Sequence, residues 1–134
     1  QLLKVKEMFD ESDKKIIDEN LIKNVLNMPF FAQIEQNDTI FKEREFYAKM
    51  PATMANKNAS LNDEFIMQGV IDLVVIKPEG VWILDYKTGK LDDEKLENYK
   101  FQLETYASVA ERAFGKKVLK RFLCMIDMQK ILEI

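Results

Sequence analysis

Apolar residues follow a helical spacing in the first quarter of the chain and a strand-like spacing after it. The helical positions form two groups: Leu2, Leu3, Val5, Met8 and Phe9, then Ile16, Ile17, Leu21, Ile22, Val25 and Leu26. Apolar side chains that recur every three or four residues share one face of a helix. The pattern breaks at Met28-Pro29, because proline inside a helix removes a hydrogen bond. Residues 1–36 are therefore predicted to form a helical segment that packs on the rest of the chain.

Three strands are predicted between residues 39 and 87. Residues 39–50 contain an alternating stretch, and residues 64–76 and 81–87 are rich in strand-forming apolar residues. The last two strands are joined by Lys77-Pro78-Glu79-Gly80, which is a turn sequence. Residues 51–63 are polar and poor in large apolar groups, so a loop is predicted there.

A long helix is predicted over residues 92–114, and at least one more strand after it. Asp92 suits the N-cap and Gly115 suits the C-terminal end. One apolar stripe runs along it: Leu96, Tyr99, Leu103, Tyr106, Ala110 and Ala113. Residues 118–127 read as a core strand, with residues 131–134 as a candidate partner. The strand before and the strand after this helix are expected to be parallel neighbours, joined by a right-handed crossover.

The predicted hairpin places two carboxylates opposite one another. If its turn is centred between Pro78 and Glu79, Asp72 falls directly across from Asp85. Opposed side chains have Cβ atoms roughly 4.5–5.5 Å apart, and like charges there are destabilising. Lys87, two residues beyond Asp85 on the same face, supplies one counter-charge. A divalent cation would supply the rest, and Mg²⁺ prefers carboxylate, water and phosphate oxygens.

Composition excludes several other kinds of site. The 134 residues suit one domain, and the net charge of −3 argues against a free-standing nucleic-acid binder. The chain has no histidine and one cysteine, which excludes histidine bases, disulfides and cysteine-bound iron–sulfur clusters within it. No apolar run is long enough to span a membrane, and no phosphate-binding G-x-x-x-x-G-K-[ST] loop is present. Because the chain starts at Gln1, we expect it to be a piece of a longer protein.

Each short motif is weak by itself. A strand that ends in Asp-x-Lys is common by chance, and short motifs carry a high false-positive risk. Gln102 and Tyr106 are four residues apart and share a helix face, but Tyr106 also fits a core position and Gln102 a solvated one.

In order along the chain, however, the motifs resemble the PD-(D/E)XK nuclease superfamily. They are Gly69-Val70-Ile71-Asp72, Asp85-Tyr86-Lys87-Thr88-Gly89 and Gln102-x-x-x-Tyr106. The resemblance is to the RecB-like nuclease domain found at the C-terminus of AddA-type helicase–nucleases, and it runs from about Phe41 to Asp127. It implies an α/β fold with a restriction-endonuclease-like core over residues 37–134. That core has a mixed central sheet flanked by helices, in the element order α-β-β-β-α-β.

The resemblance also implies roles for individual residues. The set is Asp72, Asp85 and the Tyr86 carbonyl as metal ligands, Lys87 beside the attacking water, and Gln102 and Tyr106 against the strand being cut. Glu45 corresponds to a glutamate on the family's first strand, although a salt-bridged strand residue is an equal alternative. The implied cofactor is Mg²⁺, with Mn²⁺ or Ca²⁺ able to substitute in binding, and no iron–sulfur cluster. Whether Lys87 is a base or an electrostatic clamp stays open.

The implied function is that of a DNA exonuclease domain in a bacterial, cytoplasmic, ATP-dependent helicase–nuclease. Such an enzyme processes double-strand DNA ends for recombinational repair, and its partners are DNA, the helicase domains of the same longer chain and an AddB-like subunit. RecB-like domains usually carry an upstream metal-binding histidine, so a chain without one is expected to bind Mg²⁺ weakly and cut DNA poorly. Two alternatives remain: an inactive scaffold that binds DNA or a partner subunit, and an unrelated α/β domain with a charged strand.

Overall fold

The computed structural model describes residues 19–54 and 56–134, and the expected helix over residues 2–9 lies outside them. The helices are α3 (Glu19–Leu26), α4 (Pro29–Ala32) and α5 (Asp93–Phe114), with a 3₁₀ turn, η1 (Ala52–Met54). The strands are β1 (Thr39–Pro51), β2 (Glu64–Lys77), β3 (Gly80–Lys87), β4 (Val118–Met125) and β5 (Lys130–Glu133). Proline begins α4, as expected where a helix restarts after a break.

The strands form one mixed sheet in the order β1-β2-β3-β4-β5. The β3–β4 pair is parallel, as expected for a crossover through α5, and the other pairs are antiparallel. The predicted α/β fold with a mixed sheet is therefore confirmed, and β5 adds a fifth strand that pairs along Phe122 to Met125 of β4. The region expected to be a loop after β1 begins with η1 and continues as turns.

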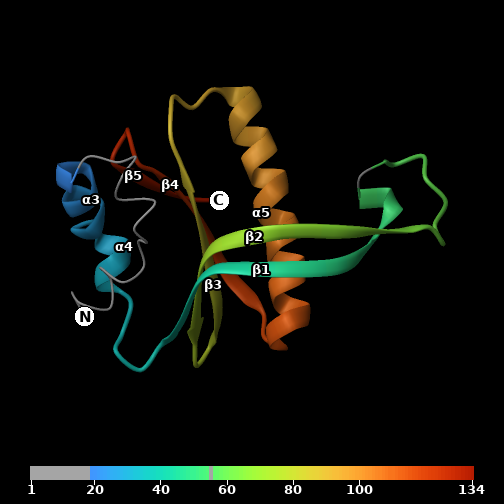
Figure 1. The fold of residues 1–134 in the computed structure, drawn as a ribbon, viewed down its shortest axis with the longest axis horizontal. Helices are drawn as coiled ribbons and strands as arrows, with labels where there is room; N and C mark the ends of the chain where they lie inside the picture. Colours follow the sequence, from blue (N-terminus) through green and yellow to red (C-terminus); the bar gives the residue numbers. More distant parts are fainter. Residues whose placement is uncertain (1–18, 55) are drawn as a thin grey trace.

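Helices cover both faces of the sheet (Figure 1), which gives two apolar layers. On one face, Phe30 of α4 packs against Trp82 and Phe122, with ring centroids 6.1 and 4.7 Å apart. On the other, α5 buries Leu103 and Ala110 against Ile83 and Leu123. Burial of each large apolar side chain contributes about 1.5–3 kcal/mol, so both layers fix the strands that lie between them.

Helix α5 begins and ends where the sequence predicts. The Asp92 side chain accepts a hydrogen bond from the Lys95 amide at 2.8 Å, and Gly115 closes the helix in the left-handed conformation with φ of 63°. The predicted apolar stripe is wrong at its end, because Ala113 is exposed. The helix buries a broader face than the stripe, which adds Thr105, Ala107 and Val109, because it lies flat on the sheet over its middle turns.

Strand β1 has a kink that the alternating pattern did not predict. Glu43 has φ of +51°, a conformation that costs a non-glycine residue about 1–2 kcal/mol. Lys42 and Arg44 on either side still pair in register with Leu73 and Ile71, so Glu43 lies opposite Asp72. The kink shifts the alternation by one residue, and as a result Phe41 and Phe46 both pack in the layer under α5.

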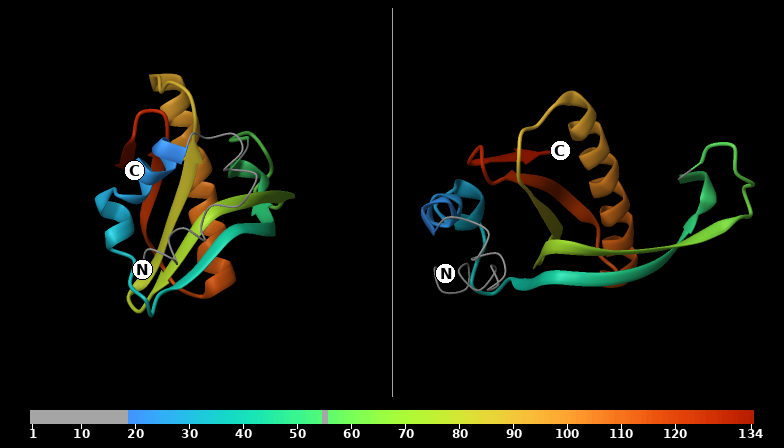
Figure 2. Two further views of the ribbon diagram at one scale, coloured as in Figure 1. Left: turned by 60° about the vertical axis from the view of Figure 1, so that its left-hand side comes forward. Right: turned by 45° about the horizontal axis from the view of Figure 1, so that its top comes forward.

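The β1–β2 hairpin extends well beyond the other strands. Figures 1 and 2 show it crossing α5 and continuing to η1 and the following turns. We call the part formed by residues 45–51 and 64–70 the arm. One face of the arm is exposed and includes apolar side chains: Tyr47 and Ile66 are each 72% exposed.

Candidate active site

Strand β3 carries alternating side chains into the two layers of the molecule. Leu84 packs beside α4, whereas Asp85 and Lys87 point toward α5. The β2–β3 pairing runs from Lys77 opposite Gly80 to Leu73 opposite Leu84, which is the predicted register. The next positions away from the turn are Asp72, just before Leu73, and Asp85, just after Leu84, so the hairpin brings the two carboxyl groups together.

Asp72 lies against the end of β3. Its Oδ2 accepts a hydrogen bond from the Tyr86 amide at 2.9 Å, and its carboxyl group is within hydrogen-bonding reach of Asp85. Burial and the adjacent Asp85 carboxylate raise the pKa of Asp72 to about 8, against the smaller opposing effects of the Tyr86 amide and Lys87. At neutral pH without a cation, a proton therefore sits between the two aspartates and reduces their repulsion.

Lys87 links the aspartates to α5. Its Nζ lies 2.7 Å from Asp85 Oδ2 and donates a hydrogen bond to Gln102 Oε1 at 2.8 Å. The Gln102 amide nitrogen in turn donates to the Tyr106 hydroxyl at 2.9 Å. The ammonium group also lies over the Tyr99 ring, 4.6 Å from its centroid. Three residues spaced along one face of α5 thus hold the charge of Lys87 in place.

Tyr106 forms the inner wall of this cluster. Its ring meets Phe46 of β1 edge-on, with centroids 5.3 Å apart. Gly69 makes room for that contact, because a Cβ there would come within 2.8 Å of the Phe46 ring. Burial, together with the charge of Asp85, raises the pKa of Tyr106, so its hydroxyl stays protonated and can donate.

The donor set fits a hard divalent cation. Asp85 is 3% exposed, and no donor meets its Oδ2 with hydrogen-bond geometry, even though Lys87 Nζ is 2.7 Å away. No group of three or more acidic, histidine or cysteine side chains gathers in the part of the chain that the structure describes. Two carboxylates supplemented by a main-chain carbonyl and waters match the way Mg²⁺ is commonly held, and fit zinc poorly.

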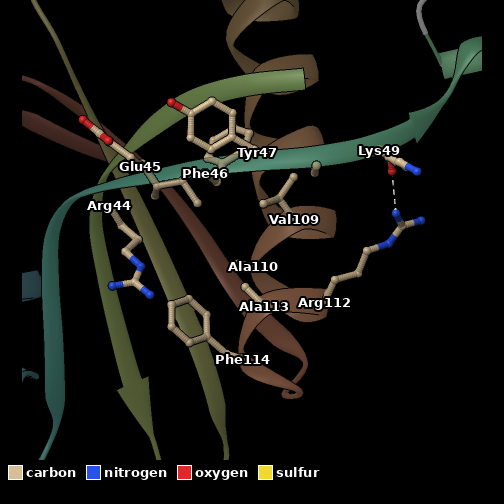
Figure 3. Close-up of a pocket in the computed structure, with 12 residues that line it drawn as sticks. Arg44, Glu45, Phe46, Tyr47, Lys49, Val109, Ala110, Arg112, Ala113 and Phe114 are labelled. Atoms are coloured by element: carbon tan, nitrogen blue, oxygen red, sulfur yellow. Dashed lines mark hydrogen bonds between the residues drawn. The ribbon is translucent and has the colours of Figure 1, made fainter. Parts of the chain in front are cut away.

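Glu45 is not brought to this cluster. It is exposed on the arm, and Figure 3 shows its carboxylate on the side of β1 opposite to Arg44 and α5. An unbroken alternation would have placed Glu45 on the same face as Phe41. The kink at Glu43 reverses that face, and Glu45 therefore lies outside the candidate site.

Two residues that support the site were not assigned to it from the sequence. Tyr99 was placed on the apolar stripe, and its position one turn before Gln102 was the signal that it could reach Lys87. Asp127 accepts a hydrogen bond from the Gly89 amide at 2.6 Å and thereby fixes the turn that follows Lys87. The parallel pairing of β3 with β4 is what places Asp127 beside this turn. An aspartate at this point of the sequence does not by itself indicate such a role.

Comparisons with known proteins identify relatives that match between two thirds and all of the chain. The model of the PD-(D/E)XK nuclease superfamily matches residues 4–131. The A-type subunit of an ATP-dependent helicase/nuclease from Carboxydothermus hydrogenoformans is 32% identical over 68% of this chain and 9% of its own length. Proteins of the same name from Listeria welshimeri and Clostridium perfringens are 26% and 23% identical over 100% and 96% of this chain. The chain spans 12% and 11% of these last two relatives, about a tenth of their length.

Proposed function

This chain belongs to the PD-(D/E)XK nuclease superfamily, and we propose that it hydrolyses DNA phosphodiester bonds with the help of a divalent cation. The observation that carries this proposal is the convergence of Asp72, Asp85 and Lys87 at the end of the β2–β3 hairpin. The family match excludes an unrelated α/β domain with a charged strand.

In this proposal, Asp72, Asp85 and the Tyr86 carbonyl hold Mg²⁺. When bound, the cation supplies charge neutralisation on the phosphate and a more acidic water. Asp85 is buried and ion-paired to Lys87, so its position is fixed before a cation arrives. The raised pKa of Asp72 means that it gives up a proton as the cation binds.

Lys87 faces the substrate in the same scheme. An ammonium group has three N–H donors; Lys87 donates one to Gln102 and pairs with Asp85 by charge. In this scheme a remaining N–H donates to a phosphate oxygen or to the attacking water. Gln102 and Tyr106 orient this group from α5 and line the place where the strand to be cut would lie.

The wider setting is inferred from the relatives, whose names describe helicase/nuclease subunits. We propose that the domain works as an exonuclease in a longer helicase–nuclease chain, beside an AddB-like subunit, in the bacterial cytoplasm. DNA would then be delivered by other domains, which agrees with the net charge of −3. Among the described residues, no helix is long and apolar enough to cross a membrane.

A second candidate is a nuclease-like scaffold that binds DNA without cutting it. The observation in its favour is that no third acidic or histidine side chain joins Asp72 and Asp85 among the described residues. Two carboxylates bind Mg²⁺ weakly unless a substrate phosphate completes the coordination. Cleavage by the longer protein separates this candidate from the nuclease.

The test is Asp85→Asn in the longer protein, compared with the parent for DNA degradation, ATP-driven unwinding and thermal melting. Degradation should fall by at least about a hundredfold, since metal-assisted activation of water contributes several kcal/mol to the barrier. Unwinding and melting should change little. Degradation that survives the substitution would contradict the proposal, and a parent that binds DNA but never degrades it would establish the scaffold instead.

A further inference from the structure

A pocket of about 380 Å³ lies between β1 and the C-terminal half of α5, outside the cluster described above. Its floor is apolar and consists of Phe46, Ile71, Val109, Ala110 and Ala113. Its rim carries two cationic side chains, Arg44 and Arg112, and the main chain of Lys49. Figure 3 shows Arg44 and Arg112 on either side of the helical floor, so a ligand in the pocket would lie between two guanidinium groups.

The two arginines are held in place without being neutralised. Arg112 donates a hydrogen bond to the Lys49 carbonyl at 2.8 Å, and Arg44 lies over the Phe41 ring, 4.9 Å from its centroid. Within residues 19–54 and 56–134, neither guanidinium forms an ion pair with a carboxylate. Glu45 is the carboxylate among the lining residues, and it points away from the pocket (Figure 3). The pocket is therefore electropositive.

The pocket adjoins the candidate active site. Phe46 is part of its floor and also contacts Tyr106, and Ile71 immediately precedes Asp72. Arg112 is six residues beyond Tyr106 on α5, a distance of about 9 Å at 1.5 Å per residue. A strand of nucleic acid whose phosphate lies beside Lys87 would reach the pocket within a few nucleotides.

We propose that this pocket is a binding subsite for the backbone of the nucleic-acid strand, holding a phosphate that flanks the one being cut. The inference rests on the proposed function, because it takes the strand to lie across Lys87 and Tyr106. Arginine suits this task because its planar group can donate two parallel hydrogen bonds to a phosphate. The apolar floor between the arginines would accept the sugar or the face of a base. An acidic peptide would match the charge but not the continuity with the active site.

The test measures binding of a fluorescein-labelled oligothymidylate to the 134-residue chain by fluorescence anisotropy, in EDTA and over a range of salt concentrations. The variant is Arg44→Gln combined with Arg112→Gln. The matched control is Lys130→Gln, an exposed cation on β5 at the other edge of the sheet. Thermal melting confirms folding, and the milder pair Arg44→Lys with Arg112→Lys keeps the charge while removing the guanidinium fork.

The glutamine pair should weaken binding about tenfold at low salt and lower the salt slope by about 0.7 for each phosphate that is no longer neutralised. The affinity of the lysine pair should lie between that of the glutamine pair and that of the parent, and Lys130→Gln should bind like the parent. Equal losses in the control and the glutamine pair would overturn the inference, as would unchanged binding in the glutamine pair or no binding by the parent. Equal competition by polyglutamate would also overturn it, and would identify an acidic peptide as the occupant.

The outcome is separable from that of the proposed function. If Asp85→Asn abolishes degradation while the glutamine pair binds normally, the nuclease assignment stands and the subsite fails. If the pair loses binding while Asp85→Asn still degrades DNA, the subsite stands and the roles of the aspartates fail.

Discussion

Asp72 is the residue at which the site is most sensitive to solution conditions. Its carboxyl group lies beside the Tyr86 amide and Asp85. The Tyr86 amide favours the ionised form of this carboxyl group, and Asp85 disfavours it. Burial and Asp85 have the larger effect, and the pKa of Asp72 rises to about 8. A group that binds its proton more tightly in the folded state stabilises the fold at low pH and loses that contribution as pH rises.

Asp72→Asn should therefore remove the part of the pH dependence of folding stability that comes from the Asp72 carboxyl group. In EDTA, the Asp72 contribution to the parent's stability should be fully present below pH 3.8 and decline until pH passes about 8. The asparagine variant should lack this contribution, so its stability relative to the parent should increase with pH by less than about 1.4 kcal/mol per unit. Urea denaturation at pH 5.5, 7 and 8.5 would check this. Parallel pH profiles for the two proteins would contradict the raised pKa.

Tyr99 is expected to position Lys87 through its ring and not through its hydroxyl. Tyr99→Phe keeps the ring under the ammonium group and should retain cleavage. Tyr99→Leu removes the ring and should lower the rate of cleavage at saturating DNA about tenfold. The reason is that a cation–π contact contributes about 1–2 kcal/mol when it is partly desolvated. The measurement is kcat and KM for DNA degradation by the longer protein. Phe101→Leu, at a half-exposed site on the same helix, is the control. A loss in Tyr99→Phe equal to that in Tyr99→Leu would place the role in the hydroxyl.

At the scale of residues, the sequence predicted the pairs that depend on regular geometry. The turn at Pro78-Glu79 fixed Asp72 opposite Asp85, and helical spacing placed Gln102 with Tyr106. Glu45 was named from the family resemblance, and it lies away from the cluster because a single left-handed residue at Glu43 exchanges the two faces of the strand beyond it. A glutamate has no visible preference for that conformation, so the pattern gave no warning.

Helix α5 is the element that carries half of the site, and its N-terminus is held by one side chain. Asp92→Ala should lower the free energy of unfolding by about 1 kcal/mol, because the Lys95 amide loses its acceptor. Asp92→Ser, which can cap equally well, should restore most of the loss. Urea denaturation measures both. If serine were as destabilising as alanine, the cap would not be the cause.

The elements themselves could be predicted because each has a local signal: proline before α4, a cap and a glycine around α5, a turn between β2 and β3. The length by which β1 and β2 extend beyond the rest of the sheet could not be predicted. Their length beyond the sheet depends on α5 supporting one face of the hairpin, which is a tertiary contact. The alternation within β1 and β2 records only which side chains are apolar, and Tyr47 of β1 and Ile66 of β2 are apolar yet exposed.

The whole molecule encloses β3 and β4 between two helical layers, and Cys124 of β4 is buried among them. Burial raises the pKa of the Cys124 thiol to about 12, so little reactive thiolate forms in the folded state.

Cys124 should therefore report unfolding of the entire domain. In native buffer at about pH 8, reaction with a thiol reagent should be limited by opening of the fold, whereas the urea-unfolded chain should react at the rate of a free thiol. The time course of labelling, followed by mass spectrometry, would show this. Rapid modification of the native protein would mean that the layer over β4 opens independently.

The arm and the central strands also differ in how their backbone amides would exchange hydrogen with solvent. Amides of β3 are flanked by paired strands on both sides and covered on both faces, so their deuterium uptake requires the domain to unfold. The outer part of the arm is a two-stranded ribbon, and its exchange requires only that the ribbon fray from η1 inward. The end of the hairpin near Asp72 would thus keep its geometry through many openings of the far end.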